Sequence, residues 1–232
     1  DDDSIKAVLC ARGGYGTVQI IDQIDFSKLI KNPKWIIGYS DVTVLHSHLN
    51  TLGVATMHAT MPINFLTNTK QALESFKKTL FENTSILECD THPFNKLGIA
   101  EGEVVGGNLS IFYSLLGSNS DINTAGKILF IEDLDEYLYH IDRMMMNLKR
   151  NGKFEKLRAM IVGGMNDMND NDIPFGKSAE QIILEHTKEF DFPICFGFPA
   201  GHLNDNRAIL LGVKSKVEIG AKKVIFSNNF QQ

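Results

Sequence analysis

The sequence of 232 residues has no excess of positive charge and no long apolar run. Its 23 Lys and Arg residues are outnumbered by 28 Asp and Glu residues, and no basic stripe is present that could neutralise phosphates, so we expect no nucleic-acid partner. No run of about 18 apolar residues occurs, so we expect neither a membrane span nor a membrane partner. A hydrophobic content of 43% is nevertheless enough for a sizeable core.

Cysteine and metal-binding patterns are also scarce. Cys10, Cys89 and Cys195 are far apart, follow no C-x-x-C spacing and lie in or beside apolar runs, so we expect buried thiols rather than disulfides or ligands. The sequence lacks an H-E-x-x-H motif and any His/Cys cluster, and we expect no metal and no other cofactor. The acid- and amide-rich segment 166–172 lacks the Gly and Glu of a calcium-binding loop, which favours a solvated loop.

Apolar runs and helical patterns alternate through the first part of the chain. Residues 5–10 and 35–38 are typical of buried strands, and a helical pattern follows each of them, at 18–24 and 42–52. A further short strand is expected around 57–59. Strands that alternate with helices predict βαβ units, and therefore a parallel sheet with helices on its faces.

The character of the sequence changes between residues 85 and 105, where short apolar stretches are separated by polar turns around Pro93. This change predicts a domain boundary, with an α/β domain at 1–85 and a second domain of mixed strands and helices at 86–232. Beyond a helix at 71–81, the expected elements are strands at 86–89, 102–105, 127–133, 158–164, 192–198, 208–211 and 223–226, and helices at 137–149 and 178–187.

Ser40 lies at an expected turn between a buried strand and a helix. A serine in that place can project its hydroxyl beyond the sheet edge, and the unpaired N–H groups at the start of the helix can hold an oxyanion. This is the geometry that a nucleophile needs, but a serine that caps a helix produces the same pattern. The Gly of a complete G-x-S-x-G motif is absent, since Val42 occupies that position. From the residues alone both interpretations stay open.

A nucleophilic serine needs a base and a carboxylate that orients the base. Glu132 and Asp133 end the expected strand at 127–133, and His202 follows the one at 192–198. Because ligand sites gather at the carboxyl ends of parallel strands, these side chains are candidates for the two roles. The weaker candidates for the base are His46 and His48, farther along the helix of Ser40, and His58, which could equally be a packed histidine.

Glycine-rich and acidic motifs are spread over essentially the whole chain. They are Cys10–Gly16 (CARGGYG), Asn32–Lys34 (NPK), Ile37–Thr43 (IGYSDVT), Gly106–Ser110 (GGNLS), Leu129–Asp133 (LFIED), Ile141–Arg143 (IDR) and Gly201–His202. In this order they resemble the LD-carboxypeptidase family of serine peptidases. The resemblance implies a flavodoxin-like N-terminal domain and a smaller mixed α/β C-terminal domain. It also implies that a further strand-helix region precedes residue 1.

The resemblance implies a role for each candidate residue. Ser40 would be the nucleophile, His202 the general base and Glu132 the orienting acid, with Glu136 as the alternative acid. The oxyanion hole would combine the backbone N–H of Asp41 with one from the Gly13–Gly14 turn, although those glycines alone would indicate only a tight turn. Expected substrate-binding residues are Arg12, Asn108 and Arg143; a structural ion pair is the alternative for both arginines, and the favoured one for Arg143.

Members of the family remove the terminal D-Ala from peptidoglycan tetrapeptides during murein recycling, without a metal. The resemblance therefore implies a cytoplasmic homodimer with a muropeptide substrate. A related branch cleaves peptidyl-nucleotide antibiotics for self-immunity and stacks an aromatic residue on adenine. Trp35, the only Trp here, lies on the strand before Ser40, which disfavours that alternative. A non-enzymatic α/β ligand-binding module, with Ser40 as a helix cap, is the third possibility.

Overall fold

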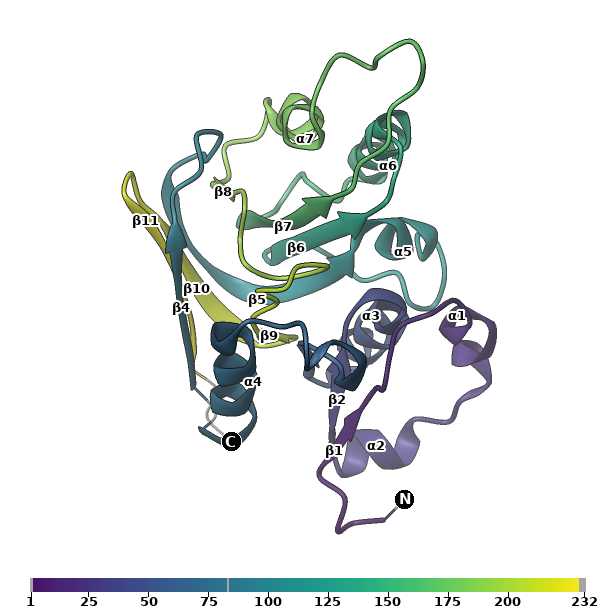
Figure 1. The fold of residues 1–232 in the computed structure, drawn as a ribbon. Helices are drawn as coiled ribbons and strands as arrows, with labels where there is room; N and C mark the ends of the chain where they lie inside the picture. The colour runs from purple at the N-terminus through teal and green to yellow at the C-terminus, as the bar shows by residue number, and fades with distance from the viewer. Residues whose placement is uncertain (1, 83, 230–232) are drawn as a thin grey trace.

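The computed structural model describes residues 2–82 and 84–229 and has a mixed α/β fold built on two sheets (Figure 1). The four-stranded sheet has the order β1-β2-β3-β9, and the seven-stranded sheet has the order β4-β11-β10-β5-β6-β7-β8. Parallel and antiparallel pairs are both present. The expected α/β class is therefore confirmed.

The smaller sheet holds the parallel core of the first part of the chain. β1 pairs with β2 and β2 with β3 in parallel, as the alternating pattern predicts, whereas β9 runs antiparallel to β3. Since β9 comes from the second half of the chain, both halves contribute to this sheet. Its strands are β1 (Ala7–Leu9), β2 (Trp35–Gly38), β3 (Thr56–His58) and β9 (Ile209–Leu211).

Short helical elements connect β1, β2 and β3, and η3 and α4 follow β3. The expected helix at 18–24 is in fact an α-helical turn continued by a 3-10 turn, and only Ile21 of its isoleucines is buried. The helical elements are α1 (Thr17–Ile20), η1 (Ile21–Gln23), α2 (Ser27–Lys31), η2 (Ser40–Val42), α3 (Thr43–Thr51), η3 (Pro62–Asn64) and α4 (Lys70–Glu82).

In the larger sheet, β5 to β8 are parallel, while β4, β11, β10 and β5 form an antiparallel series. Helices α5, α6 and α7 lie over β6 and β7 (Figure 1), and their apolar side chains join those of the strands in one core cluster. The bounds are β4 (Thr84–Asp90), β5 (Gly98–Asn108), α5 (Leu109–Ser114), β6 (Ile128–Leu134), α6 (Leu138–Arg150), β7 (Ala159–Asn166), α7 (Ala179–Thr187), β8 (Ile194–Cys195), β10 (Lys214–Ile219) and β11 (Lys223–Asn229).

Four elements are not predicted by the sequence patterns: α2, η3, α5 and β10. The stretch expected at 102–105 is part of the much longer β5, in which exposed Glu101 and Glu103 alternate with buried neighbours. A half-solvated strand of this kind contains no continuous apolar run. All three cysteines are free thiols, but only Cys195 is buried, whereas Cys10 and Cys89 are half-buried. No helix of the described residues is long and apolar enough to span a membrane. The domain boundary at residue 85 stays a prediction.

Candidate active site

Ser40 occupies a strained turn at the carboxyl end of β2. Its φ of 64° is in the left-handed region, which non-glycine residues rarely adopt. The residue that precedes η2 is Tyr39, and neither η2 nor α3 has a side-chain cap. The capping explanation for Ser40 therefore has no hydrogen bond to support it. Strain of this kind is common at functional sites.

The glycine-rich loop after β1 lies directly against this turn. A Cβ at Gly13 would be 2.9 Å from Cβ and 3.0 Å from Oγ of Ser40, so a larger residue would displace the serine. The loop is held by the buried carboxylate of Asp41, whose Oδ2 accepts hydrogen bonds from Gly16 N at 3.2 Å, Thr17 N at 3.1 Å and Thr17 Oγ1 at 2.7 Å. Asp41 thus holds the glycine-rich loop in place beside Ser40, its neighbour in the sequence.

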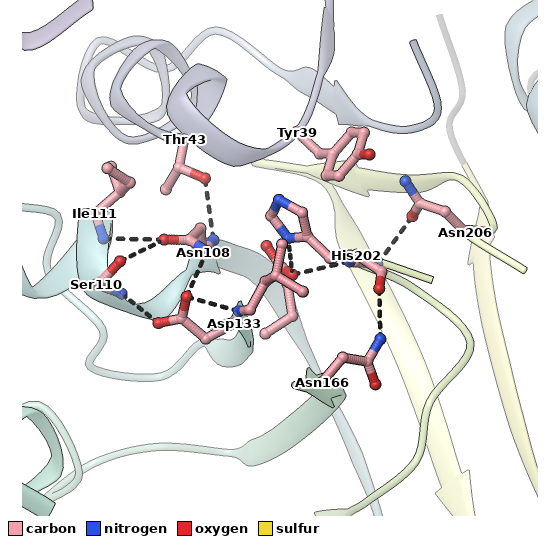
Figure 2. A network of polar contacts seen from close by, with 12 residues as sticks. Tyr39, Thr43, Asn108, Ser110, Ile111, Asp133, Asn166, His202 and Asn206 are labelled. Carbon is pink, nitrogen blue, oxygen red and sulfur yellow. Dashed lines mark hydrogen bonds and ion pairs between the residues drawn. The ribbon is translucent and has the colours of Figure 1, made fainter. Parts of the chain in front are cut away.

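Glu132 and His202 form a pair at the carboxyl end of β6. Oε2 of the fully buried Glu132 lies 2.7 Å from Nδ1 and 3.0 Å from the backbone N of His202. This approach requires Gly201, because a Cβ there would be 2.6 Å from the same carboxylate oxygen. Two asparagine side chains hold the backbone at this point. Asn206 Oδ1 accepts a hydrogen bond from Gly201 N at 2.9 Å, and Asn166 Nδ2 donates one to the carbonyl of His202 (Figure 2).

The carboxylate also sets the protonation of the imidazole. Because an ionised carboxylate only accepts hydrogen bonds, the contact assigns the ring hydrogen to Nδ1 and leaves Nε2 able to accept a proton. Burial acts to lower the pKa of His202, but the hydrogen bond and the charge of Glu132 outweigh it, so the pKa is raised above the ordinary histidine value. His202 is therefore a strengthened base.

Tyr39 also contacts the imidazole ring of His202. Its ring meets that of His202 edge-on at a centroid distance of 4.8 Å, and its hydroxyl donates to Oδ1 of Asn64 at 2.9 Å. Tyr39 is buried, and this burial, followed by the charge of Glu132, raises the pKa of its phenol. The uncharged Tyr39 ring therefore packs against the His202 imidazole.

Ser40 and His202 line the same surface hollow, which has a volume of about 160 Å³, although no hydrogen bond joins them in this structure. Such contacts are often long without substrate and tighten when it binds. Met61, Ile63 and Asn64 follow β3, and no motif pointed to them; only their place after a strand end could have suggested them. The lining residues are Arg12, Gly13, Gly14, Tyr39, Ser40, Met61, Ile63, Asn64 and His202.

Two of the expected substrate-binding residues do not line the hollow. Asn108 is 5% exposed, and its side-chain amide forms hydrogen bonds only within the protein. Arg143 lies on the exposed side of α6, with its guanidinium 5.3 Å from the centroid of the Tyr139 ring. Arg12 alone of the three borders the hollow.

Glu136, His48 and His46, three of the other candidates for the acid and the base, have partners of their own. Glu136 Oε2 lies 2.5 Å from Nδ1 of His140, and Nδ1 of His48 lies 3.0 Å from the hydroxyl of Ser120. His46 is buried beneath the Ser40 turn, with Nε2 3.0 Å from the carbonyl of Gly38. Burial lowers the pKa of His46 to about 4.

His58 is fully buried at the end of β3, and its ring packs against those of Tyr39 and Phe130. Burial, followed by the neighbouring histidines, lowers the pKa of His58 well below the ordinary value. Within residues 2–82 and 84–229, no group of three or more His, Cys, Asp or Glu side chains is placed to hold a metal ion.

Comparison with known proteins shows the family to which the chain belongs. The family models of the LD-carboxypeptidase N-terminal and C-terminal domains match residues 1–59 and 101–217. A probable murein peptide carboxypeptidase of Bacillus subtilis is 38% identical over 97% of this chain and 72% of its own length. The microcin C7 self-immunity protein MccF of Escherichia coli is 26% identical over 97% of this chain and 75% of its own length.

Among solved structures, the muramoyltetrapeptide carboxypeptidase from Oxalobacter formigenes is similar, with a TM-score of 0.89 and 26% identity, over 100% of this chain and 81% of that one. The family models, the curated relatives and this solved structure agree. The chain therefore belongs to the LD-carboxypeptidase family and is a hydrolase of the carboxypeptidase class.

Proposed function

We propose that this protein is a serine-type LD-carboxypeptidase that removes the terminal D-Ala from peptidoglycan tetrapeptides. The observation that carries the proposal is the contact of 2.7 Å between Glu132 and His202, in a site where His202 and the strained Ser40 share one hollow. The relatives named for murein peptides support the choice of substrate.

In the proposed reaction, Oγ of Ser40 attacks the carbonyl carbon of the bond to D-Ala while Nε2 of His202 takes the hydroxyl proton. The carboxylate of Glu132 stabilises the imidazolium that forms. The proton then passes from Nε2 to the departing amine of D-Ala, and the C–N bond breaks. Water, activated by the same base, hydrolyses the acyl-enzyme and returns the serine.

The negative charge of each tetrahedral intermediate needs fixed donors. The backbone N–H of Asp41 and one N–H of the Gly13–Gly14 turn are the proposed pair, because the loop lies against Ser40 and is held there by the carboxylate of Asp41. A preorganised donor of this kind contributes about 3–4 kcal/mol to lowering the barrier.

Arg12 is the proposed partner of the free carboxylate of D-Ala. It is exposed at the rim of the hollow and forms no ion pair with any residue of the described ranges. Trp35 lies on β2 and does not line the hollow, so it provides no surface for stacking on a nucleobase there. Both features favour a short peptide with a charged C-terminus over a nucleotide conjugate.

The test is a direct comparison of substrates. We expect release of D-Ala from a muropeptide-like tetrapeptide that ends in a diamino acid followed by D-Ala, and far slower reaction when the last residue is L-Ala or amidated D-Ala. The variant Ser40→Ala should lose turnover and remain folded, because the Ser40 side chain caps neither η2 nor α3. Rapid cleavage of an aminoacyl-sulfamoyl adenosine without D-Ala release would favour the self-immunity reaction. A lack of cleavage of either substrate would favour a binding module.

We further propose, from the family resemblance, that the protein acts as a homodimer in the cytoplasm. Sedimentation of the purified protein and fractionation of cells that produce it test these two points. A monomer at micromolar concentration, or recovery outside the cytoplasmic fraction, would contradict them.

A further inference from the structure

The start of the helix that follows Ser40 is tied to the larger sheet. Thr43, the first residue of α3, is fully buried, and its Oγ1 accepts a hydrogen bond from the backbone N of Asn108 at 3.0 Å. This close approach depends on Gly107, because a Cβ there would be 2.5 Å from the same hydroxyl oxygen. The end of β5 is therefore in direct contact with the segment that carries Ser40.

Asn108 extends this contact to the strand of Glu132. Its Nδ2 donates to Oδ1 of Asp133 at 2.9 Å, while its Oδ1 accepts from Ile111 N at 3.1 Å and from Ser110 Oγ at 2.9 Å. Asp133 is 2% exposed and directly follows Glu132; its Oδ2 accepts from Ser110 N at 2.9 Å. Figure 2 shows the continuous path from Thr43 through Asn108 to Asp133.

This path joins two parts of the site that come from different sheets. Ser40 follows β2 of the smaller sheet, whereas Glu132 belongs to β6 of the larger one. A buried donor or acceptor left without its partner is costly, so bonds of this kind hold one defined arrangement. Both polar atoms of the Asn108 side chain have partners within the protein, one for Nδ2 and two for Oδ1.

We propose that Thr43, Asn108 and Asp133 form a positioning bridge that sets the place of Ser40 relative to the Glu132–His202 pair. The proposal rests on the proposed function, because its effect is on a reaction in which Ser40 and His202 act together. None of the three residues lines the hollow. Their influence on the reaction is therefore indirect, through the distance and direction of the nucleophile.

The test uses variants that change the bridge with little change of shape. Thr43→Val removes the acceptor oxygen, whereas Thr43→Ser keeps it and should restore activity. The matched control is Thr124→Val: Thr124 is also buried, but its hydroxyl donates to the carbonyl of Lys153 at 2.7 Å and takes no part in the bridge. Activity is measured as D-Ala release from the tetrapeptide, well below the melting temperature of each variant.

We expect Thr43→Val to lower kcat by about 10- to 100-fold, with KM changed by less than about 3-fold, because a small misplacement of reacting groups acts on the chemical step. Thr43→Ser and Thr124→Val should keep kcat within about 3-fold of the original protein. If the Thr43 hydroxyl had only a structural role, Thr43→Val would lower the melting temperature, as we expect for Thr124→Val, and would leave kcat unchanged.

A folded Thr43→Val protein with unchanged kcat would overturn the proposal. If that variant does not fold, Asn108→Ala is assayed with the same expectation, since it breaks the link to Asp133 and keeps the backbone N–H opposite Thr43. The failure of the proposed function itself is distinguishable, because the unmodified protein would then release no D-Ala.

Discussion

One oxygen of Glu132, Oε2, accepts two hydrogen bonds from His202, one from the ring Nδ1 at 2.7 Å and one from the backbone N at 3.0 Å. A single carboxylate oxygen therefore holds both the imidazole ring and the backbone of His202 in place. It also explains the glycine before His202, since any side chain at position 201 would occupy the space of the carboxylate.

The first prediction separates the two acids. Glu132→Gln should lower kcat for D-Ala release by about three to four orders of magnitude, because an amide no longer stabilises the imidazolium and can favour the wrong tautomer. Glu136→Gln should change kcat by only a few-fold, since Glu136 is paired with His140. Steady-state kinetics of the two purified variants provides the measurement. A larger loss for Glu136→Gln would transfer the role to that residue.

The second prediction concerns the pH at which His202 loses its proton. Because Glu132 raises the pKa of His202, the proton is retained to a higher pH than in a free histidine, and kcat/KM should rise with pH through a midpoint above 6.5. NMR titration of the ring in Ser40→Ala measures the pKa of His202 directly. Adding Glu132→Gln should lower it, and an unchanged value would show that the carboxylate does not set it.

The third prediction uses two neighbouring glycines as a matched pair. Gly13→Ala should reduce kcat by at least about 10-fold, because the new Cβ would be 2.9 Å from Cβ of Ser40 and must displace either the loop or the nucleophile. At Gly14 a Cβ would meet no atom within 4 Å, so Gly14→Ala should be tolerated. Kinetics and melting temperature of both variants are compared. Equal activity would contradict the close packing of loop and serine.

The fourth prediction concerns stability in acid. Burial lowers the pKa of His46 to about 4, so below pH 6.5 the unfolded chain gains a proton that the folded protein takes up only near pH 4. Stability should therefore fall as the pH decreases through this window, by about 3 kcal/mol from this residue. Asp133 acts in the opposite sense, because burial and the charge of Glu132 raise its pKa to about 7.

Comparison of variants isolates the contribution of His46. Urea denaturation of the original protein and of His46→Gln, at pH 7 and at pH 4.5, gives the change in unfolding free energy with pH. The variant should show a smaller loss on acidification, whatever its stability at pH 7. Parallel losses in the two proteins would contradict the assignment.

Local patterns determined much of what surrounds Ser40. The apolar run of β2, the break at Gly38 and the helical pattern beyond it predict the strand–turn–helix, because each depends on neighbouring residues. The same holds for the glycine-rich turn after β1. Glu132, at the end of an expected strand, and His202, after another, are candidates in sequence because parallel strands bring their carboxyl ends to one edge.

Only the tertiary structure decided which of these groups meet. The pairing of β9 with β3, the contact of Asn108 with Thr43 and the hold of Asn166 on His202 join residues far apart in the chain. No local pattern encodes such contacts, since they depend on how the fold brings distant segments of the chain together. The same limit applies to Asn108, for which the family resemblance implies a role in substrate binding, whereas in the fold its side chain is buried and donates to Asp133 of β6.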